Sequence, residues 1–173
     1  MASAEFSAAG LIDAARHMVP TGRGRPREPR LRRAISTAYY AAFTALTSEV
    51  ARHYPSGAAR HAVRRLVSHA AARRSCSDLR ASRSVPWLHG NPACHPDLLE
   101  FAAHFERLHI LRNLADYDHE YSCTKSEASA VLGRARRAIE ALASARKRCP
   151  EQLDILCIAA LADDRGRRQI SKR

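Results

Sequence analysis

Apolar residues recur at steps of three and four along several long segments of this chain, and this periodicity constrains the fold most. The segment that begins at Arg30 carries such a stripe. Its members are Ile35, Ala38, Tyr39, Ala42, Phe43, Leu46 and Val50. Residues three and four apart lie on one face of an α-helix, so the stripe predicts a helix with one buried side. No segment alternates apolar and polar residues as a β-strand does, and we therefore predict an all-α fold.

Helix start and stop signals divide the rest of the chain. Thr124, with Glu127 three positions later, has the pattern of a capping box. Prolines open two further segments, as expected at the first turn of a helix. The expected helices are residues 3–18, 30 to before 55, 56–72, 96 onward, 124 onward and 150–162. These signals predict a bundle of four to six helices.

The length of 173 residues suits one domain, 1–173, with a core at about 30–145. Residues 19–29 hold three prolines and two glycines and are expected to form a basic linker. Residues 75–96 are expected to form a long loop before the next helix, and 163–173 a charged tail. The loop is a candidate for a functional segment because long structureless loops are uncommon in compact domains.

The chain carries 29 Lys and Arg against 17 Asp and Glu, a formal net charge of +12. One interpretation is an anionic partner, with nucleic acid first and an acidic protein second. The other is codon bias, because 26 of the basic residues are arginine, as in products of GC-rich genomes. The candidate RNA-binding residues are Arg23, Arg25, Arg27, Arg64 and Arg65.

The five cysteines are odd in number and widely spaced, which favours reduced thiols and a cytoplasmic protein over a disulfide framework. No C-x-x-C pair is present, and the set Cys76, His89, Cys94 and His95 matches no standard zinc spacing, so we expect no metal and no cofactor. No segment has the length and apolar character of a membrane span, and the first residues do not resemble a signal peptide.

One run of polar residues stands at the end of an apolar helical segment and reads RNLADYDHEY, from Arg112 to Tyr121. Arg112 and His119 are seven positions apart. On a continuous helix they would lie about 20° apart around the axis and about 10 Å apart along it. A fixed cation and a group that titrates near neutrality on one face suit the chemistry of a phosphodiester.

Two stretches resemble the HEPN family of small helical domains. Residues 31–43 read LRRAISTAYYAAF and resemble the family helix R-x-A-x-S-x-A-Y-Y-A-x-F. Residues 111–119 read LRNLADYDH and resemble both the R-x(4–6)-H motif and the R-x-x-A-D-Y-D form of one bacterial branch. The resemblance implies a HEPN-like bundle with a long loop before the motif helix. It also implies a homodimer in which two motif helices meet in a cleft.

Many members of that family cleave RNA without a metal, several as toxins or antiviral defence effectors. From charge and ordinary pKa values, Arg112 is expected to stabilise the extra charge at the phosphorus in such a reaction. His119 is expected to take the proton from the 2′-hydroxyl or to give one to the leaving 5′-oxygen. Under the resemblance, Asn113 orients the phosphate or the arginine. Tyr121 ends a His-x-Tyr pattern that, in some toxin members, carries a tyrosine modified with AMP by a partner nucleotidyltransferase.

Other interpretations of the same residues remain. Arg112 also suits an ordinary helix ion pair with Asp116, four positions later. His109 shares the face of Arg112 and is a second candidate for the general base. The prediction is therefore a metal-independent endoribonuclease that acts on RNA. The alternative is a catalytically inactive module that binds nucleotide, nucleic acid or a partner protein such as a nucleotidyltransferase antitoxin.

Overall fold

The structure, a computed structural model, describes residues 7–20 and 27–162, and these residues form seven α-helices and no named strand. The helices are α1 (Ala8–Met18), α2 (Glu28–Ala51), α3 (Gly57–Leu66), α4 (His69–Ser82), α5 (Pro96–Tyr117), α6 (Lys125–Arg148) and α7 (Pro150–Leu161). The prediction of an all-α fold is confirmed.

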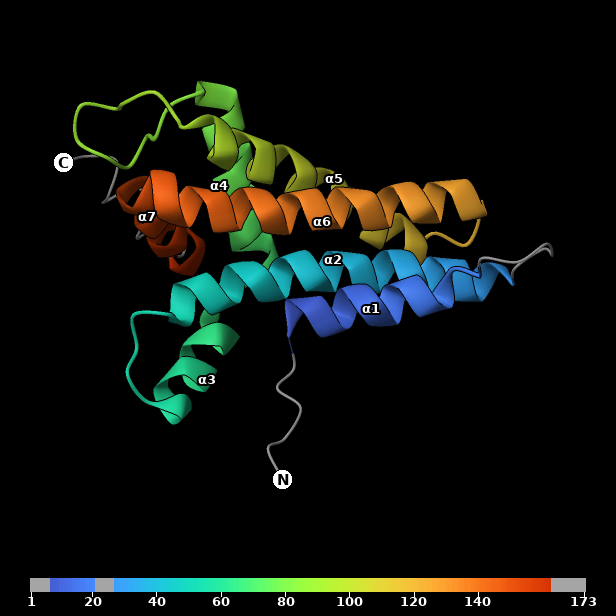
Figure 1. Cartoon of the computed structure of the whole chain (residues 1–173). Helices are drawn as coiled ribbons and strands as arrows, with labels where there is room; N and C mark the ends of the chain where they lie inside the picture. Colours follow the sequence, from blue (N-terminus) through green and yellow to red (C-terminus); the bar gives the residue numbers. More distant parts are fainter. Residues whose placement is uncertain (1–6, 21–26, 163–173) are drawn as a thin grey trace.

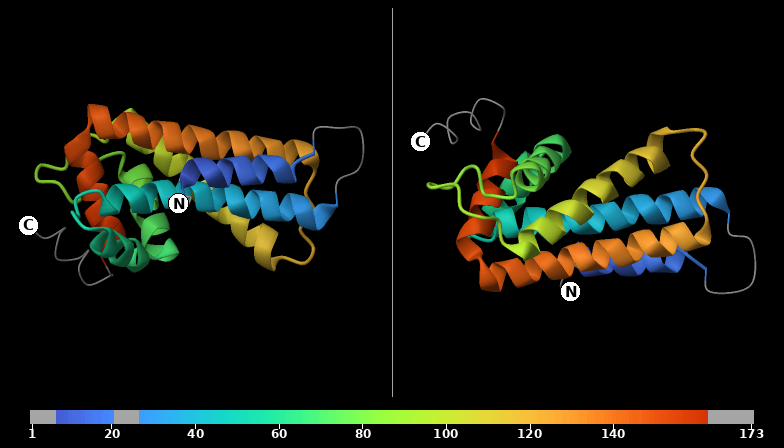
Figure 2. Two further views of the ribbon diagram at one scale, coloured as in Figure 1. Left: turned by 60° about the horizontal axis from the view of Figure 1, so that its bottom comes forward. Right: turned by 90° about the horizontal axis from the view of Figure 1, so that it is seen from above.

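Four helices form the body of the molecule. α1, α2 and α6 run side by side along its length, and α5 packs against α2 and α6 at an angle to them (Figures 1 and 2). α2 and α6 pack on each other, and both carry alanines with no exposed surface, among them Ala38 and Ala42 on α2 and Ala135 and Ala138 on α6. These small side chains allow close approach of the helices, so much of the alanine content serves packing.

The predicted helix over 56–72 is wrong in its extent. The structure ends α3 at Leu66 and begins α4 at His69, after Ser68 accepts a hydrogen bond from the backbone N–H of Ala71. Ser68 is thus a helix N-cap in the middle of the predicted segment. This break explains why the described residues contain more helices than the four to six predicted.

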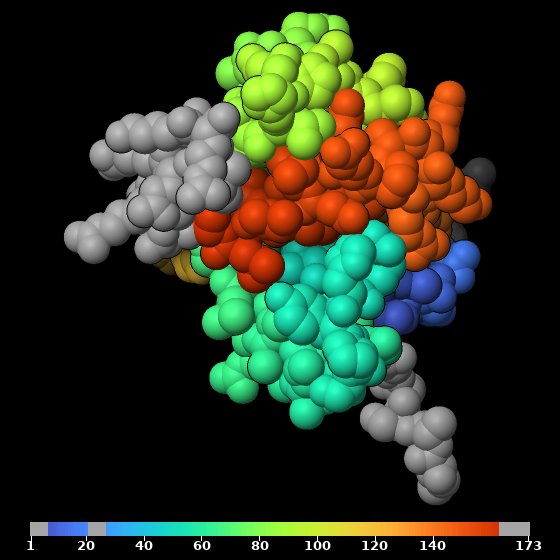
Figure 3. Space-filling model, turned by 90° about the vertical axis from the view of Figure 1, so that its left-hand side faces the viewer, coloured from blue at the N-terminus to red at the C-terminus, as the bar shows by residue number. Residues whose placement is uncertain are grey.

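The long loop predicted over 75–96 is also shorter than expected, because α4 continues to Ser82. The segment that remains, 83–95, is held by an isolated antiparallel bridge between Ser84 and Ala93. α7 lies between this segment and the end of α2, and it closes one end of the bundle (Figure 3).

Other element boundaries agree with the sequence. α5 begins at Pro96, α7 begins at Pro150, and Thr124 and Glu127 form the predicted capping box at the start of α6. Within the described residues, no helix is both long and apolar enough to cross a membrane. The expectations for residues 3–6, most of the basic linker and the tail 163–173 lie outside the described residues.

Candidate functional site

The helix that carries Arg112 ends before it reaches His119. α5 ends at Tyr117, and Asp118 takes an extended conformation as its C-cap. The side chain of Asp118 accepts a hydrogen bond from the backbone N–H of Glu120 at 2.9 Å, a local turn that competes with the helix. His119 therefore lies in the following loop, and the prediction that Arg112 and His119 share one helix face is wrong.

Arg112 itself is half-buried and held on three sides. Its Nη2 donates to the hydroxyl of Tyr40 at 2.9 Å, and its Nη1 donates to the amide oxygen of Asn113 at 3.1 Å. Its Nε lies 2.7 Å from a carboxylate oxygen of Asp116, so the predicted ion pair is present. The guanidinium also lies over the ring of Tyr117, 5.1 Å from its centroid.

These partners also stabilise the charged form of Arg112. Burial lowers the pKa of the guanidinium, but the hydrogen bond to Tyr40 and the carboxylate of Asp116 outweigh it, so the net pKa is raised. The side chain is 14% exposed. Nη1 and Nη2 each use one of their two N–H groups in these hydrogen bonds and keep the other without a partner among the described residues. Nε lies in the ion pair with Asp116 but makes no hydrogen bond in the described part of the chain. Arg112 is thus a fixed cation whose remaining N–H groups can donate to a ligand.

Asn113 and His109 extend this arrangement along α5. Asn113 receives the bond from Arg112 on its oxygen, so its NH₂ group faces Nδ1 of His109, at 3.3 Å. The amide nitrogen donates, so Nδ1 of His109 accepts, and the neutral ring carries its hydrogen on Nε2. Burial is the first cause that lowers the pKa of His109, and the charges of Arg73, His69 and Arg112 lower it further.

One residue of this site, His69, has no signal in the sequence. Nδ1 of His69, the first residue of α4, lies 2.7 Å from the hydroxyl of Tyr39, and the His69 ring packs against Phe43 in a tilted arrangement at a centroid distance of 4.0 Å. Burial and the charge of Arg112 lower its pKa. No local signal distinguishes His69 from the other histidines, because α4 brings it to α2 and α5 only in the folded chain.

We call the group of Tyr39, Tyr40, Phe43, His69, His109, Arg112 and Asn113 the aromatic cluster. Tyr39 is its centre, with no exposed surface, and burial raises the pKa of its hydroxyl, so this hydroxyl stays protonated. The hydroxyl of Tyr39 contacts His69, and that of Tyr40 accepts a hydrogen bond from Arg112.

Arg32 on α2 fixes the end of α5. Its guanidinium donates to three backbone carbonyls, those of Ala115 at 2.8 Å, Asp118 at 2.6 Å and Tyr121 at 3.2 Å. The last carbonyls of a helix have no partner within it, and a cation there is favourable. Arg32 therefore holds both the last turn of α5 and the loop that carries His119.

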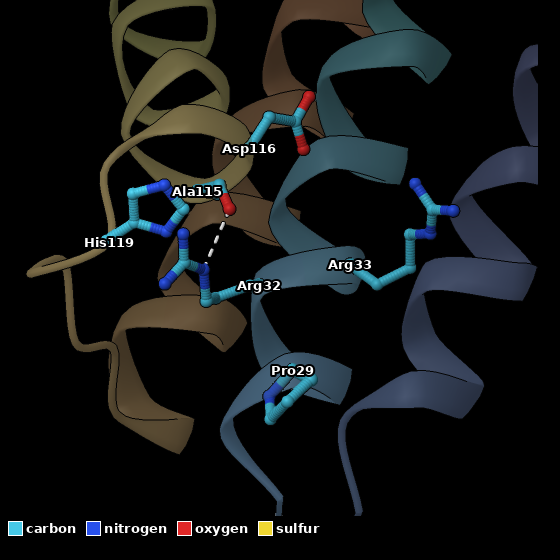
Figure 4. A pocket seen from close by; sticks show the side chains of 6 residues that line it. All are labelled: Pro29, Arg32, Arg33, Ala115, Asp116 and His119. Carbon is cyan, nitrogen blue, oxygen red and sulfur yellow. Dashed lines mark hydrogen bonds between the residues drawn. The ribbon is translucent and has the colours of Figure 1, made fainter.

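A second group of residues forms an open pocket beside Arg32. The pocket has a volume of about 360 Å³ and is lined by Pro29, Arg32, Arg33, Ala115, Asp116 and His119. Its side chains come from α2 and from the end of α5 and the loop after it (Figure 4). We call it the open pocket. Asp116 connects it to the aromatic cluster, because its carboxylate contacts Arg112 and accepts from Ser36 at 3.1 Å.

The remaining candidates lie apart from these two groups. Tyr121 is half-buried, and burial is the first cause that raises its pKa. Arg27 is the exposed N-cap of α2, while Arg64 and Arg65 lie on α3. Arg23 and Arg25 lie outside the described residues.

No group of three or more potential metal ligands is present among residues 7–20 and 27–162. All five cysteines are buried. Comparison of the chain with protein-family models, with curated proteins and with solved structures finds no match.

Proposed function

We propose that this protein is a metal-independent endoribonuclease of the HEPN type, with Arg112 as the group that binds the scissile phosphate. The observation that carries the proposal is the state of Arg112. It is a half-buried cation, positioned by Tyr40, Asn113 and Asp116, and it keeps two N–H donors for a ligand. A planar guanidinium is well suited to two oxygens of one phosphate.

The proposed reaction uses the 2′-hydroxyl of the RNA as nucleophile. A base removes its proton, the oxygen bonds to phosphorus, and the bond from phosphorus to the 5′-oxygen breaks. The leaving oxygen takes up a proton, and the products are a 2′,3′-cyclic phosphate and a 5′-hydroxyl. Arg112 stabilises the additional negative charge on the phosphoryl oxygens in the transition state.

We assign the proton transfer to His119. It is exposed, it lines the open pocket with Asp116, and Asp116 in turn contacts Arg112. His109, the second candidate for the base, is less suitable because the amide of Asn113 donates to its Nδ1 and leaves a hydrogen on Nε2. His109 is then a hydrogen-bond donor to the substrate.

The proposal includes a homodimer and a role as a toxin or phage-defence effector, with a nucleotidyltransferase antitoxin as a candidate partner. An apolar surface beside the site supports the dimer. Ile110 and Tyr117 are seven positions apart on α5 and are 46% and 67% exposed. Residues with this spacing share one helix face, and Tyr117 also contacts Arg112, so a second copy on this face would adjoin the site.

A specific observation favours a second function, an inactive module that binds nucleic acid or protein. The ion pair of Arg112 with Asp116 is the arrangement expected when the arginine has only a structural role. In this case Arg112 would hold the end of α5, and the basic surface alone would bind the partner.

RNA cleavage in the presence of EDTA separates the two functions. The purified protein, Arg112→Ala and His119→Ala would each be offered total RNA and a tRNA pool, and the product ends would be analysed for cyclic phosphate. We expect cleavage in EDTA, with a loss of about 10²–10³ in rate for Arg112→Ala. His119→Ala is expected to lose about 10²–10⁴ in rate.

Matched controls come from the same chain. Arg107 is an exposed arginine on α5, and His89 is an exposed histidine in a loop. Arg107→Ala and His89→Ala should cleave at the wild-type rate. Cleavage that is equal in all variants would indicate a contaminant or another site, and no cleavage by any form would favour the binding module.

A further inference from the structure

The aromatic cluster gathers more basic side chains than the proposed reaction uses. Three basic side chains surround the ring of Tyr39. The ring centroids of His69 and His109 each lie 5.6 Å from that of Tyr39, and the guanidinium carbon of Arg112 lies 6.0 Å from it. The three groups come from α4 and α5, so they meet only through the packing of these helices on α2.

A fourth basic group adjoins them from α4. Arg73 is exposed and follows His69 by four positions, which places both on one face of the helix. The charge of Arg73 is felt at His109, across the α4–α5 contact. The carboxylate of Asp116 contacts one member of this group, Arg112, and it also accepts a hydrogen bond from Ser36.

The two histidines differ in their ability to accept a proton. His69 faces the hydroxyl of Tyr39, which donates to a neutral imidazole and can rotate to accept from a charged one. His109 faces the NH₂ group of Asn113, which only donates, and Arg112 holds that amide in place. A proton on Nδ1 of His109 would therefore meet another donor, whereas a proton on His69 keeps its hydrogen bond.

We propose that His69, Arg73 and His109, beside Arg112, form an anion subsite that binds the phosphate next to the scissile one, and that His69 takes up a proton when this phosphate binds. The assignment of the anion to RNA rests on the proposed function. His109 stays neutral and donates from Nε2. Arg73 supplies the exposed charge at the entrance of the subsite.

The subsite explains why both histidines are half-buried beside two arginines. Without an anion, burial and the charge of Arg112 lower the pKa of His69, so the ring is neutral near pH 7. A bound phosphate opposes these effects and raises the pKa. The titratable and charged groups near His69 are Tyr39 and Tyr40 from α2 and His109 and Arg112 from α5. Binding must therefore strengthen as the pH falls from about 8 to about 6.

The test is calorimetry on the intact protein with a short RNA that has 2′-O-methyl groups throughout, so that the nucleophile is blocked and only binding is measured. Titrations at about pH 6.5 in two buffers of different ionisation enthalpy give the number of protons taken up. We expect about one proton per bound RNA. Inorganic phosphate, titrated in the same way, serves as the second probe.

Variants then locate the proton and the charge. His69→Gln should abolish the proton uptake, and His109→Gln should weaken binding but retain the uptake. His104→Gln is the matched control, because His104 is also half-buried with a lowered pKa but contacts Arg134 on α6. All three variants should show cooperative thermal unfolding before binding is interpreted.

Arg73→Gln keeps the proposal testable if a histidine variant does not fold, because Arg73 is exposed. It should weaken RNA binding about three- to tenfold and reduce the slope of log Kd against log salt by about 0.7. Arg136→Gln, an exposed arginine on α6 outside the cluster, is the control for a general loss of positive charge. It should change affinity less than Arg73→Gln does.

The outcomes separate the subsite from the proposed function. The subsite is overturned if RNA binds without proton uptake, or if the uptake is unchanged in His69→Gln. Neither result contradicts the ribonuclease activity, which the cleavage assay tests separately. Uptake through His69 with inorganic phosphate but no RNA binding supports the subsite and overturns its assignment to RNA. No binding of either probe overturns the subsite.

Discussion

The aromatic cluster and the open pocket lie on either side of Asp116, and they are built in opposite ways. In the cluster, Arg112 and His69 are half-buried, and their contacts come from three different helices. In the pocket, Arg33 and His119 are exposed, and His119 lies in a loop. Packing thus fixes the groups of the cluster, while those of the pocket depend on how the end of α5 is held.

This difference separates two kinds of residue within one site. A change in the cluster should alter stability and function together, because each side chain there is part of the packing. A change at an exposed pocket residue should alter function alone. Arg32 is the exception, since it lines the pocket but also holds the backbone of α5.

The largest expected effect on stability is that of Arg32→Ala. The substitution removes the donor to the carbonyls of Ala115, Asp118 and Tyr121, and these groups cannot all find new partners. We expect a loss of about 2–4 kcal/mol in the free energy of unfolding, since bonds to a charged group contribute about 1.5–3 kcal/mol each and are not additive. Urea denaturation measures it.

Arg33→Ala is the matched control for this prediction. Arg33 is the next residue on α2 and also lines the pocket, but it is exposed and makes no described hydrogen bond or ion pair. Its loss should change the free energy of unfolding by less than about 0.5 kcal/mol. Equal losses in the free energy of unfolding for the two substitutions would contradict the conclusion that Arg32 stabilises the end of α5.

A smaller effect is expected for Tyr39→Phe. The aromatic packing is retained, but Nδ1 of His69 loses its 2.7 Å partner in a half-buried position. We expect a loss of about 1–2 kcal/mol in the free energy of unfolding. Tyr54→Phe, at a 38% exposed tyrosine, should have almost no effect. If Tyr39→Phe leaves the free energy of unfolding unchanged, this hydrogen bond does not stabilise the cluster.

The pH dependence of stability tests the cluster in a different way. The pKa values of His69 and His109 are lowered in the folded protein, so the unfolded chain binds more protons below about pH 6.5. Stability is therefore retained above this pH and falls as the pH decreases through it. The midpoint of urea unfolding, measured between about pH 7.5 and pH 5.5, should decrease. In His69→Gln, the midpoint of urea unfolding should fall less over the same pH range.

The smallest effect on stability is expected for His119→Ala. His119 is exposed, so the free energy of unfolding should change by less than about 0.5 kcal/mol, although the proposed cleavage is lost. Thermal unfolding and RNA cleavage on the same sample provide the comparison. A marked loss of stability would place His119 with the packed residues of the cluster and remove the distinction between the two regions.

The sequence predicts the helices well where their start signals are local. Pro96, Pro150 and the pair Thr124 and Glu127 each mark a helix start that the structure contains. The break at Ser68 was missed because the apolar period continues from α3 into α4, although Ser68 is itself a typical cap residue. Periodicity alone does not reveal a break that preserves it.

The candidate site was predicted in part. Arg112, Asn113, Asp116 and His109 do lie together, because they are neighbours on one helix. The period of that helix, extended to residue 119, predicts His119 on the same face, but α5 ends at Tyr117, where Asp118 and Arg32 hold the chain in another conformation. The contribution of Arg32 comes from more than eighty positions away in the chain, so no local pattern indicates it.

The sequence by itself determined that the chain is helical, where most helices start, and which polar residues follow one another on α5, because capping and periodicity act over a few residues. The tertiary structure alone decided that α5 stops at Tyr117, that His69 joins Arg112 around Tyr39, and that Asp116 lies between two regions. These features depend on contacts between α2, α4 and α5, and such contacts exist only once the apolar faces of the helices have packed.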